Sequence, residues 1–402
     1  FGSILAALRE HRLVTGVIAL VIALSCAWLC SAGSVIDTRL SAMSITSGVD
    51  ESALGVVTVT GFEADEANDL NARMVAGLRS VPGVESVHVV STVPFGPGWG
   101  VAGVSLDRKS YPAVVEFYEG DPGAARALGL QLVAGRMPEP DDYQEQPEKG
   151  YFQASSRVLV SRELADKLWP DDTALGKTFW SGDNRFRVIG VVAHLAMAQP
   201  ATWGKRQPGW SVFVPALPGK RLSGTYLIRA RPQDLERVMV AARARVRDIA
   251  PGVVLDSASS QSVTTLRQRY FKADRDMAGL LLGVIAALLL VTALGIVGLA
   301  SFWVAQRRKQ IGIRRAVGAT RRDILRYFQT ENFLIVSFGI ALGMVLAFGL
   351  NLILMQSWEL ARLSWWYLPV GAVALWLLGQ AAVLAPALRA ARVPPVVATR
   401  TV

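Results

Sequence analysis

Four stretches of the chain contain no charged residue and are long enough to cross a membrane. They cover residues 13–36, 277–306, 332–358 and 363–388. A helix of about 20 apolar residues spans the hydrocarbon core of a bilayer, and each stretch is longer than that. Four such runs in one chain favour membrane helices over buried helices of a soluble core. We therefore expect one membrane helix, a large extramembrane insertion, and three further membrane helices.

The insertion contains a repeated pattern of predicted elements. Alternating and β-branched residues predict strands, and apolar residues one turn apart, such as Leu70, Met74 and Leu78, predict amphipathic helices. The order strand, helix, Pro-Gly turn, strand occurs twice, at 54–60, 64–80, 81–84 and 86–90, and again at 226–231, 233–249, 250–253 and 254–256. Two such units usually pair into one ferredoxin-like split βαβ sandwich.

The two halves of this repeat are far apart in the sequence. We therefore expect residues 105–220 to form a second lobe inserted between them, with strands near 113–118, 157–160, 185–193 and 211–214. Residues 138–150 are acidic and rich in proline, which predicts an exposed, mobile loop. From Ser260 onward the pattern predicts a continuous helix to residue 306, which would join the insertion rigidly to the membrane.

Charge fixes the expected orientation. The chain is 51% hydrophobic and 18% charged, with a net charge of +10, whereas soluble domains carry about 25% charged residues. Residues 33–276 hold 28 basic and 28 acidic residues, so the whole excess lies in the flanking segments. Basic residues mark the cytoplasmic side of short membrane loops. We expect both termini and residues 307–331 to be cytoplasmic, the insertion to lie outside, and the basic loop not to bind nucleic acid.

The first apolar run follows Arg9 and Arg12 and resembles a signal peptide. Its uncharged length and the orientation favour a retained membrane helix instead. Cys26 and Cys30 lie on one face of this helix and are interpreted as packing residues, not as a metal site or a disulfide. The chain begins with Phe1, and whether a further segment precedes it stays open.

No enzyme signature is found in the sequence. The three histidines are scattered, and none belongs to a paired metal-binding motif. Gly176-Lys177-Thr178 resembles the end of a phosphate-binding loop, but Asp171 replaces the earlier glycine of that motif. The predicted membrane helices lack the mid-depth charge that ion-driven transporters usually need. We expect no catalytic residue, metal or cofactor in this chain.

The most informative segment is the basic loop, which reads Gln-Arg-Arg-Lys-Gln-Ile-Gly-Ile-Arg-Arg-Ala-Val-Gly-Ala-Thr-Arg-Arg-Asp-Ile-Leu over residues 306–325. Ile311, Arg314 and Arg315 are expected to continue the preceding helix. Residues 318–320 form a break, and Thr320 is expected to cap a short helix over residues 321–328 with Asp323 as its acidic partner. A structured basic hairpin between two membrane helices predicts docking to a cytoplasmic partner.

This segment closely resembles the signature of the MacB/FtsX-like permeases of ABC transporters. The sequences at 158–161, 164–170, 175–177 and 187–192 and the tail at 386–398 also resemble that family. Two positions depart from it, because glutamates of the family are Gln310 and Val397 here. These departures indicate either neutral drift or the pairing of two different permeases.

The resemblance implies a non-catalytic subunit of a type VII, mechanotransmission ABC transporter in the bacterial inner membrane. A cytoplasmic ATPase dimer, which binds ATP and Mg²⁺, would move the periplasmic domains of two permease subunits. A periplasmic adaptor and an outer-membrane channel are further expected partners. The resemblance assigns ATPase coupling to one segment, Gly312, Ile313, Arg314, Arg315, Ala316, Val317, Gly318, Ala319, Thr320, Arg321, Arg322, Asp323, Ile324 and Leu325.

The expected fold is an α-helical four-helix membrane bundle with a large α+β, two-lobed extracytoplasmic domain. Its parts are a juxtamembrane segment 1–12, helix 1 at 13–36, a periplasmic core domain 37–275, a stalk and helix 2 at 260–306, the coupling region 307–331, helix 3 at 332–358, helix 4 at 363–388 and a tail 389–402. Within the core domain, a porter-like lobe (50–104 and 221–260) flanks the inserted lobe 105–220.

Several functions fit this organisation. The leading one is export of peptides, antibiotics, siderophores or toxins from the periplasm. The alternatives are a Lol-like permease that releases lipoproteins, an FtsX-like regulator of cell-wall hydrolases, and a sensing module without an ATPase. Phe95 and Trp99, in a Gly-Pro-rich loop, are candidates for contact with a periplasmic partner or, equally, for a plug between the two lobes.

Overall fold

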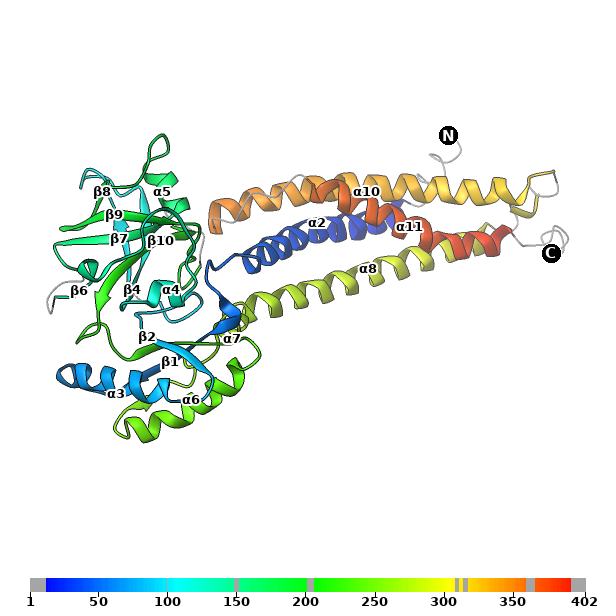
Figure 1. The fold of residues 1–402 in the computed structure, drawn as a ribbon. Helices are drawn as coiled ribbons and strands as arrows, with labels where there is room; N and C mark the ends of the chain where they lie inside the picture. The colour runs from blue at the N-terminus through cyan, green and yellow to red at the C-terminus, as the bar shows by residue number, and fades with distance from the viewer. Residues whose placement is uncertain are drawn as a thin grey trace. The chain divides into compact units, whose positions relative to one another are not determined.

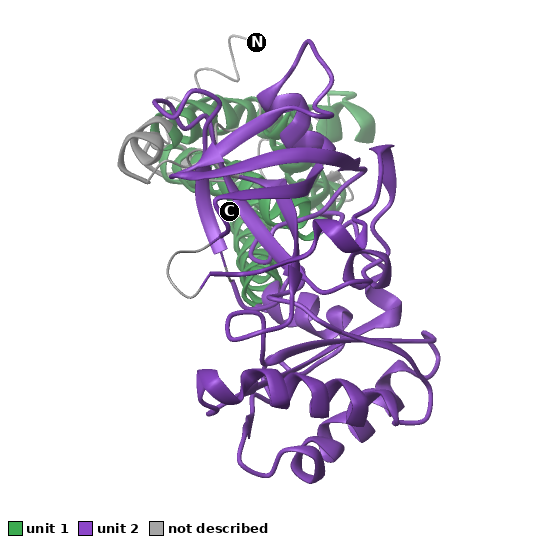
Figure 2. Cartoon of the chain, turned by 60° about the vertical axis from the view of Figure 1, so that its left-hand side comes forward, with its two compact units in different colours: residues 1–43, 273–402 green, residues 44–272 purple. Residues whose placement is uncertain are grey.

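The computed structural model describes residues 12–98, 100–147, 152–200, 206–307, 311–313, 317–358 and 366–391. The chain divides into two compact units (Figure 2). The extramembrane unit is Ser44–Lys272, and the helical unit combines Phe1–Met43 with Ala273–Val402.

The elements of the two units follow one another as labelled in Figure 1. The helices are α2 (Arg12–Met43), α3 (Ala67–Arg79), α4 (Ala124–Ala127), α5 (Arg162–Leu168), α6 (Leu235–Ile249), α7 (Val263–Tyr270), α8 (Lys272–Gln306), α10 (Arg321–Trp358) and α11 (Tyr367–Ala391). The strands are β1 (Leu54–Thr60), β2 (Val84–Val89), β3 (Gly100–Val104), β4 (Ala113–Gly120), β5 (Leu132–Gly135), β6 (Gln144–Glu145), β7 (Ser155–Ser161), β8 (Thr178–Ser181), β9 (Asn184–Val192), β10 (Arg206–Leu217), β11 (Thr225–Ala230) and β12 (Val254–Leu255).

The first lobe of the extramembrane unit is a four-stranded antiparallel sheet in the order β12-β1-β11-β2. This is the strand order of a ferredoxin-like sandwich, so the predicted repeat is confirmed. Helices α3 and α6 lie together beside the sheet (Figure 1). Leu70, Met74 and Leu78 of α3 are fully buried against it, as their one-turn spacing predicts.

The second lobe is an eight-stranded sheet with β3-β4-β10-β7-β9-β5 along its main path. Its core includes an aromatic cluster in which the Phe186 ring contacts those of Phe117 and Phe179. The short strands β3, β5, β6 and β8 were absent from the sequence prediction. We expected residues up to 104 in the first lobe, but β3 pairs antiparallel with β4 and therefore belongs to the second sheet.

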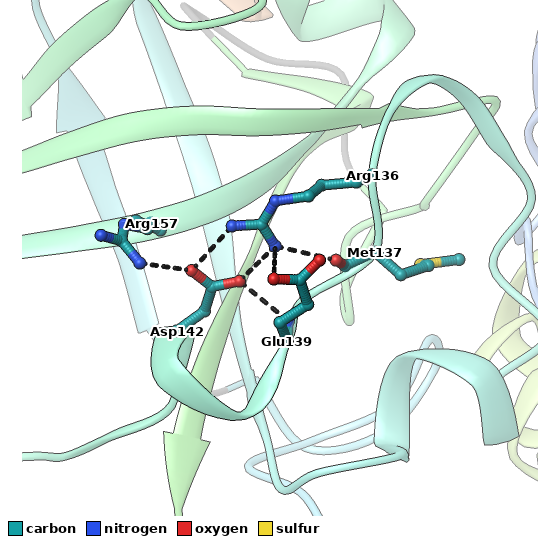
Figure 3. A network of polar contacts seen from close by, with 5 residues as sticks. All are labelled: Arg136, Met137, Glu139, Asp142 and Arg157. Carbon is teal, nitrogen blue, oxygen red and sulfur yellow. Dashed lines mark hydrogen bonds and ion pairs between the residues drawn. The ribbon is translucent and has the colours of Figure 1, made fainter.

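The expectation of an exposed, mobile loop at 138–150 is wrong in one respect. Asp142 lies in this segment, and its side chain is completely buried between Arg136 and Arg157 (Figure 3). The backbone N–H of Glu139 also donates to it, at 2.8 Å. Burial alone would raise the pKa of the Asp142 carboxyl, but the hydrogen bonds from Arg136, Glu139 and Arg157 hold that pKa below its usual range. This carboxylate anchors the loop; residues 148–150 lie outside the described structure.

The helical unit contains all four helices that, among the described residues, are long and apolar enough to cross a membrane. These segments are Gly16–Met43, Lys272–Gln306, Arg321–Gly349 and Tyr367–Ala390. Helix α10 packs against both α2 and α11. A Cβ atom added at Gly343 would lie 2.6 Å from the Ala23 carbonyl oxygen, so this glycine allows a very close approach of two helices.

Two of the expected helices differ in extent. The predicted short helix at 321–328 and helix 3 form one 38-residue helix, α10, because nothing in residues 329–331 ends the helix. The predicted continuous helix from residue 260 to 306 is instead two helices, α7 and α8. The interruption falls at Phe271, whose ring is buried in the extramembrane unit.

Candidate functional site

The coupling segment begins where α8 ends at Gln306. The backbone N–H of Ile311 donates to the Arg307 carbonyl at 2.9 Å, and residues 311–313 are helical. Gly318 then adopts a left-handed conformation with φ +105°, which glycine accepts without strain. The break predicted at 318–320 is therefore confirmed. The expected positions of Arg314, Arg315 and Ala316 lie outside the described residues.

Thr320 and Asp323 form the predicted cap of α10. The Asp323 backbone N–H donates to Thr320 Oγ1 at 3.3 Å, and Asp323 Oδ2 accepts from the Thr320 backbone N–H at 3.0 Å and from its hydroxyl at 2.6 Å. This reciprocal arrangement satisfies donors at the start of the helix that would otherwise lack partners. The cap fixes where the chain turns from the break into α10.

A cavity of about 160 Å³ lies within this hairpin. Its apolar walls include Ile311, Ile324 and Phe328, which are buried. Arg307 and Asp323 bring opposite charges to the same cavity. The hairpin thus has a packed apolar interior and a cavity lined by both apolar and charged side chains.

The outer surface of the segment combines apolar and basic side chains. Ile313 is 53% exposed and Val317 is 84% exposed. Arg321 and Arg322, at the start of α10, are also exposed. Exposed aliphatic side chains flanked by arginines are typical of a protein-binding surface, because the apolar groups gain from burial and the charges select the partner.

An ion pair at the base of the hairpin was missed from the sequence. Arg307 Nη1 lies 3.2 and 3.1 Å from the two carboxylate oxygens of Glu331, and the two side chains are 14% and 2% exposed. The pair joins the end of α8 to α10. The sequence could have indicated this pair. Arg307 directly follows the uncharged run 277–306, and Glu331 directly precedes the uncharged run 332–358.

Phe95, predicted either to contact a periplasmic partner or to plug the space between the lobes, is a buried residue of the extramembrane unit. Phe95 is only 4% exposed, and its ring lies 6.0 Å from that of Tyr270 and 5.7 Å from that of Phe271. The Arg267 guanidinium lies 5.0 Å from the same ring. The aromatic ring therefore packs beneath the end of α7, and Trp99 lies outside the described residues.

The described part of the chain contains no group of three or more His, Cys, Asp or Glu side chains placed to hold a metal ion. Cys26 and Cys30 are free and buried in α2. His194 hydrogen-bonds to Glu163, which raises the pKa of the histidine although burial opposes this. Its other ring nitrogen lies 2.5 Å from the Thr46 carbonyl oxygen, so it ties two segments of the extramembrane unit together.

Two family models match the chain. The MacB-like periplasmic core domain matches residues 15–251, and the FtsX-like permease C-terminal family matches residues 282–395. The chain is 25% identical, over 299 residues, to a macrolide export ATP-binding/permease protein MacB of Shewanella sp. strain ANA-3, covering 72% of this chain and 42% of that protein. It is 29% identical over 208 residues to MacB 2 of Yersinia pestis bv. Antiqua strain Antiqua, covering 49% and 29% respectively.

The chain spans less than half the length of these curated relatives. The periplasmic region of MacB from Actinobacillus actinomycetemcomitans is a similar solved structure, with 14% identity and a TM-score of 0.35 over 55% of this chain and 94% of that one. Since the core-domain model alone covers more than half of the sequence, this chain belongs to the MacB/FtsX-like family of ABC transporter permeases.

Proposed function

We propose that this chain is the mechanotransmission permease of a type VII ABC transporter. A separate ATPase dimer would bind ATP and Mg²⁺, and this chain would convert hydrolysis into motion of its periplasmic domain without catalysing a reaction itself. Both termini would lie in the cytoplasm, and two permease subunits would act together.

The observation that supports this proposal is the capped hairpin between α8 and α10. Its exposed Ile313 and Val317 lie next to arginines, and its packed base connects to two membrane helices. A passive loop needs neither a helix cap nor an internal ion pair. A surface that must pass a displacement from a partner to the membrane helices needs both rigidity and exposed apolar contacts.

Export is the favoured use of that motion. The relatives named above are macrolide export proteins, and the two-lobed extramembrane unit is large enough to engage an adaptor that leads to an outer-membrane channel. Peptides, antibiotics, siderophores and toxins remain the proposed substrate classes. Lipoprotein release and regulation of cell-wall hydrolases are the alternatives, and the periplasmic partner recovered with the chain would distinguish them.

The test is affinity purification of the full chain in mild detergent, followed by mass spectrometry. The wild-type chain is expected to recover an ABC ATPase. Val317→Asp should abolish that recovery, because it places a charge in the exposed apolar contact without disturbing a buried residue. Val240→Asp is the matched control, since Val240 is a similarly exposed valine on α6. Recovery of no ATPase with the wild-type chain, or equal recovery with both variants, would contradict the proposal.

A further inference from the structure

The Arg307–Glu331 pair occupies a special place in the helical unit. The two residues flank the coupling hairpin, one directly after α8 and the other within α10. Both side chains are largely buried, although they lie at the border of membrane-spanning segments. Ionisable groups in such positions are expensive to bury and commonly mark functional sites. Packing alone does not explain why a charge pair stands here.

The pair lies between two cavities. Arg307 lines the 160 Å³ cavity inside the coupling hairpin. Glu331 lines a second, smaller cavity of about 20 Å³ inside the helix bundle, together with Trp303 and Phe328. Phe328 contributes to both cavities. The ion pair therefore connects the space open to a cytoplasmic partner with the interior of the bundle.

Trp303 brings an unused hydrogen-bond donor to the small cavity that Glu331 also lines. Its indole Nε1 is buried and has no hydrogen-bond partner among the described residues. Its ring faces the Arg307 guanidinium, 5.7 Å from the ring centroid, and it lines the small cavity with Glu331. A buried donor without a partner is costly. Glu331 thus accepts from Arg307 and shares a cavity with an unpaired indole donor, which are the elements of a two-state switch.

Helix α8 is suited to respond to such a switch. Its buried apolar side chains that join the bundle core, Ile296, Ala300 and Val304, all lie in the half near Arg307. Toward the other end, Leu280 and Leu282 are exposed, and nothing lies within 4 Å of a Cβ added at Gly283. A rigid helix transmits a displacement of the end near Arg307 over its length, toward the Arg39–Asp274 ion pair near its other end.

We propose that Arg307, Glu331 and Trp303 form a latch that reports occupancy of the coupling cavity to α8. An acidic side chain of the ATPase enters the cavity and draws Arg307 away from Glu331, and Glu331 then accepts a hydrogen bond from the Trp303 indole. The acidic partner follows from Arg307, which lines the cavity, and from the exposed arginines in the first turns of α10, Arg321, Arg322 and Arg326. The latch rests on the proposed function, because it needs a cytoplasmic ATPase as its occupant.

These three residues are positioning residues, so their test separates hydrolysis from coupling. The full chain and its recovered ATPase are reconstituted in lipid nanodiscs. ATP hydrolysis is measured together with the nucleotide-dependent change in hydrogen exchange of the α8 amides. Trp303→Phe keeps an aromatic ring beside Arg307 but removes the alternative donor. We expect hydrolysis to stay within about twofold of wild type and the α8 response to fall about tenfold.

Two further variants distinguish loss of the latch from a general loss of packing. Trp376→Phe is the matched control, because it removes an indole that donates to Ser337 Oγ at 3.0 Å in the same unit, away from the latch. It should leave the α8 response unchanged. The double variant Arg307→Met with Glu331→Leu replaces the pair by apolar side chains of similar volume, which buried sites commonly tolerate. It should fold and, at an ATPase concentration high enough to offset the lost Arg307 contact, should still lack the α8 response.

Each outcome decides the proposal. A normal α8 response in Trp303→Phe or in the double variant would overturn the latch and leave the proposed function standing. Equal losses in Trp303→Phe and Trp376→Phe would show a general loss of packing and would also overturn it. A wild-type chain that recruits no ATPase would overturn the proposed function, and the latch with it.

Discussion

The two units of this protein are stabilised by opposite kinds of contact. In the extramembrane unit, large aromatic side chains such as Phe117, Phe179 and Phe186 fill the core, where burial from water provides the driving force. In the helical unit the close contacts are made by glycines, as at Gly339 and Gly343 against α2. Lipid is as apolar as leucine, so only close packing and polar links favour association of helices there. Burying the same hydrophobic side chain therefore stabilises the extramembrane unit more than it stabilises the helical unit.

The largest expected effect comes from deleting an aromatic ring in each unit. Phe186 is fully buried and stacks on Phe179 with the ring centroids 5.2 Å apart. Phe186→Ala should lower the free energy of unfolding by about 4 kcal/mol. Phe302 lies on α8 and is exposed. Phe302→Ala should therefore change the free energy of unfolding by less than about 0.5 kcal/mol. Urea unfolding of the full chain in nanodiscs, followed by near-ultraviolet circular dichroism, measures the free energy of unfolding of both variants. Equal losses of stability would contradict the difference between the two units.

The second prediction adds a side chain at a glycine, whereas the first removes one. Gly343→Leu should destabilise the helical unit by about 3 kcal/mol, because its Cβ would lie 2.6 Å from both the Ala23 carbonyl oxygen and the Cys26 Cβ. Gly283→Leu adds the same atoms on α8, where nothing lies within 4 Å. Unfolding by increasing mole fractions of SDS reports the helical unit. Similar midpoints for the two variants would refute the role of close helix contact.

A third prediction concerns a polar anchor of the extramembrane unit. Asp142→Asn should cost about 2 kcal/mol, because it weakens charged hydrogen bonds to a buried group. The pKa of the Asp142 carboxyl is depressed in the folded state. Its contribution is therefore complete above the ordinary aspartate pKa of about 3.9 and is lost as the pH falls through the lower, folded pKa.

The pH series supplies the control for that variant. Unfolding of the wild-type chain is compared with that of Asp142→Asn from pH 6 downward, and the difference between them should shrink only at acidic pH. The neighbouring Asp141 is exposed, so Asp141→Asn should follow the wild-type chain throughout. A difference that stays constant below about pH 3 would exclude the anchoring role of the carboxylate.

The smallest effect is expected at the polar link between α2 and α8. Ser25 Oγ and Thr292 Oγ1 are 2.8 Å apart, and both residues are buried. Hydrogen bonds between membrane helices contribute about 0.6 kcal/mol on average. A double-mutant cycle with Ser25→Ala and Thr292→Val should give a coupling free energy of that size. A value near zero would mean that this hydrogen bond does not help to hold α8 against α2.

The sequence predicted well where local pattern and tertiary contacts agree. Strand β1 has the expected bounds, since β-branched residues alternate there and the strand is central in its sheet. The cap of α10 was also predictable, because Thr320 and Asp323 interact over three residues. Membrane spans follow from composition, although α10 extends further than the uncharged run.

The errors arose where distant parts of the chain decide the outcome. Asp142 is buried because Arg136, just after β5, and Arg157, in β7, converge on it, which no local pattern reveals. Phe95 is buried because the end of α7 covers it. The Arg307–Glu331 pair joins residues 24 positions apart across a hairpin whose geometry had to be known first.

The connection between β2 and β11 has an evolutionary consequence. These strands pair directly, and the backbone N–H of Val90 donates to the Thr225 carbonyl at 3.1 Å, as at the end of a β-hairpin. The entire second lobe is thus, in topological terms, the loop of that hairpin. The entropic cost of closing a loop rises only slowly with its length. Such a lobe can be enlarged, trimmed or exchanged between lineages while every strand of the four-stranded sheet keeps its neighbours.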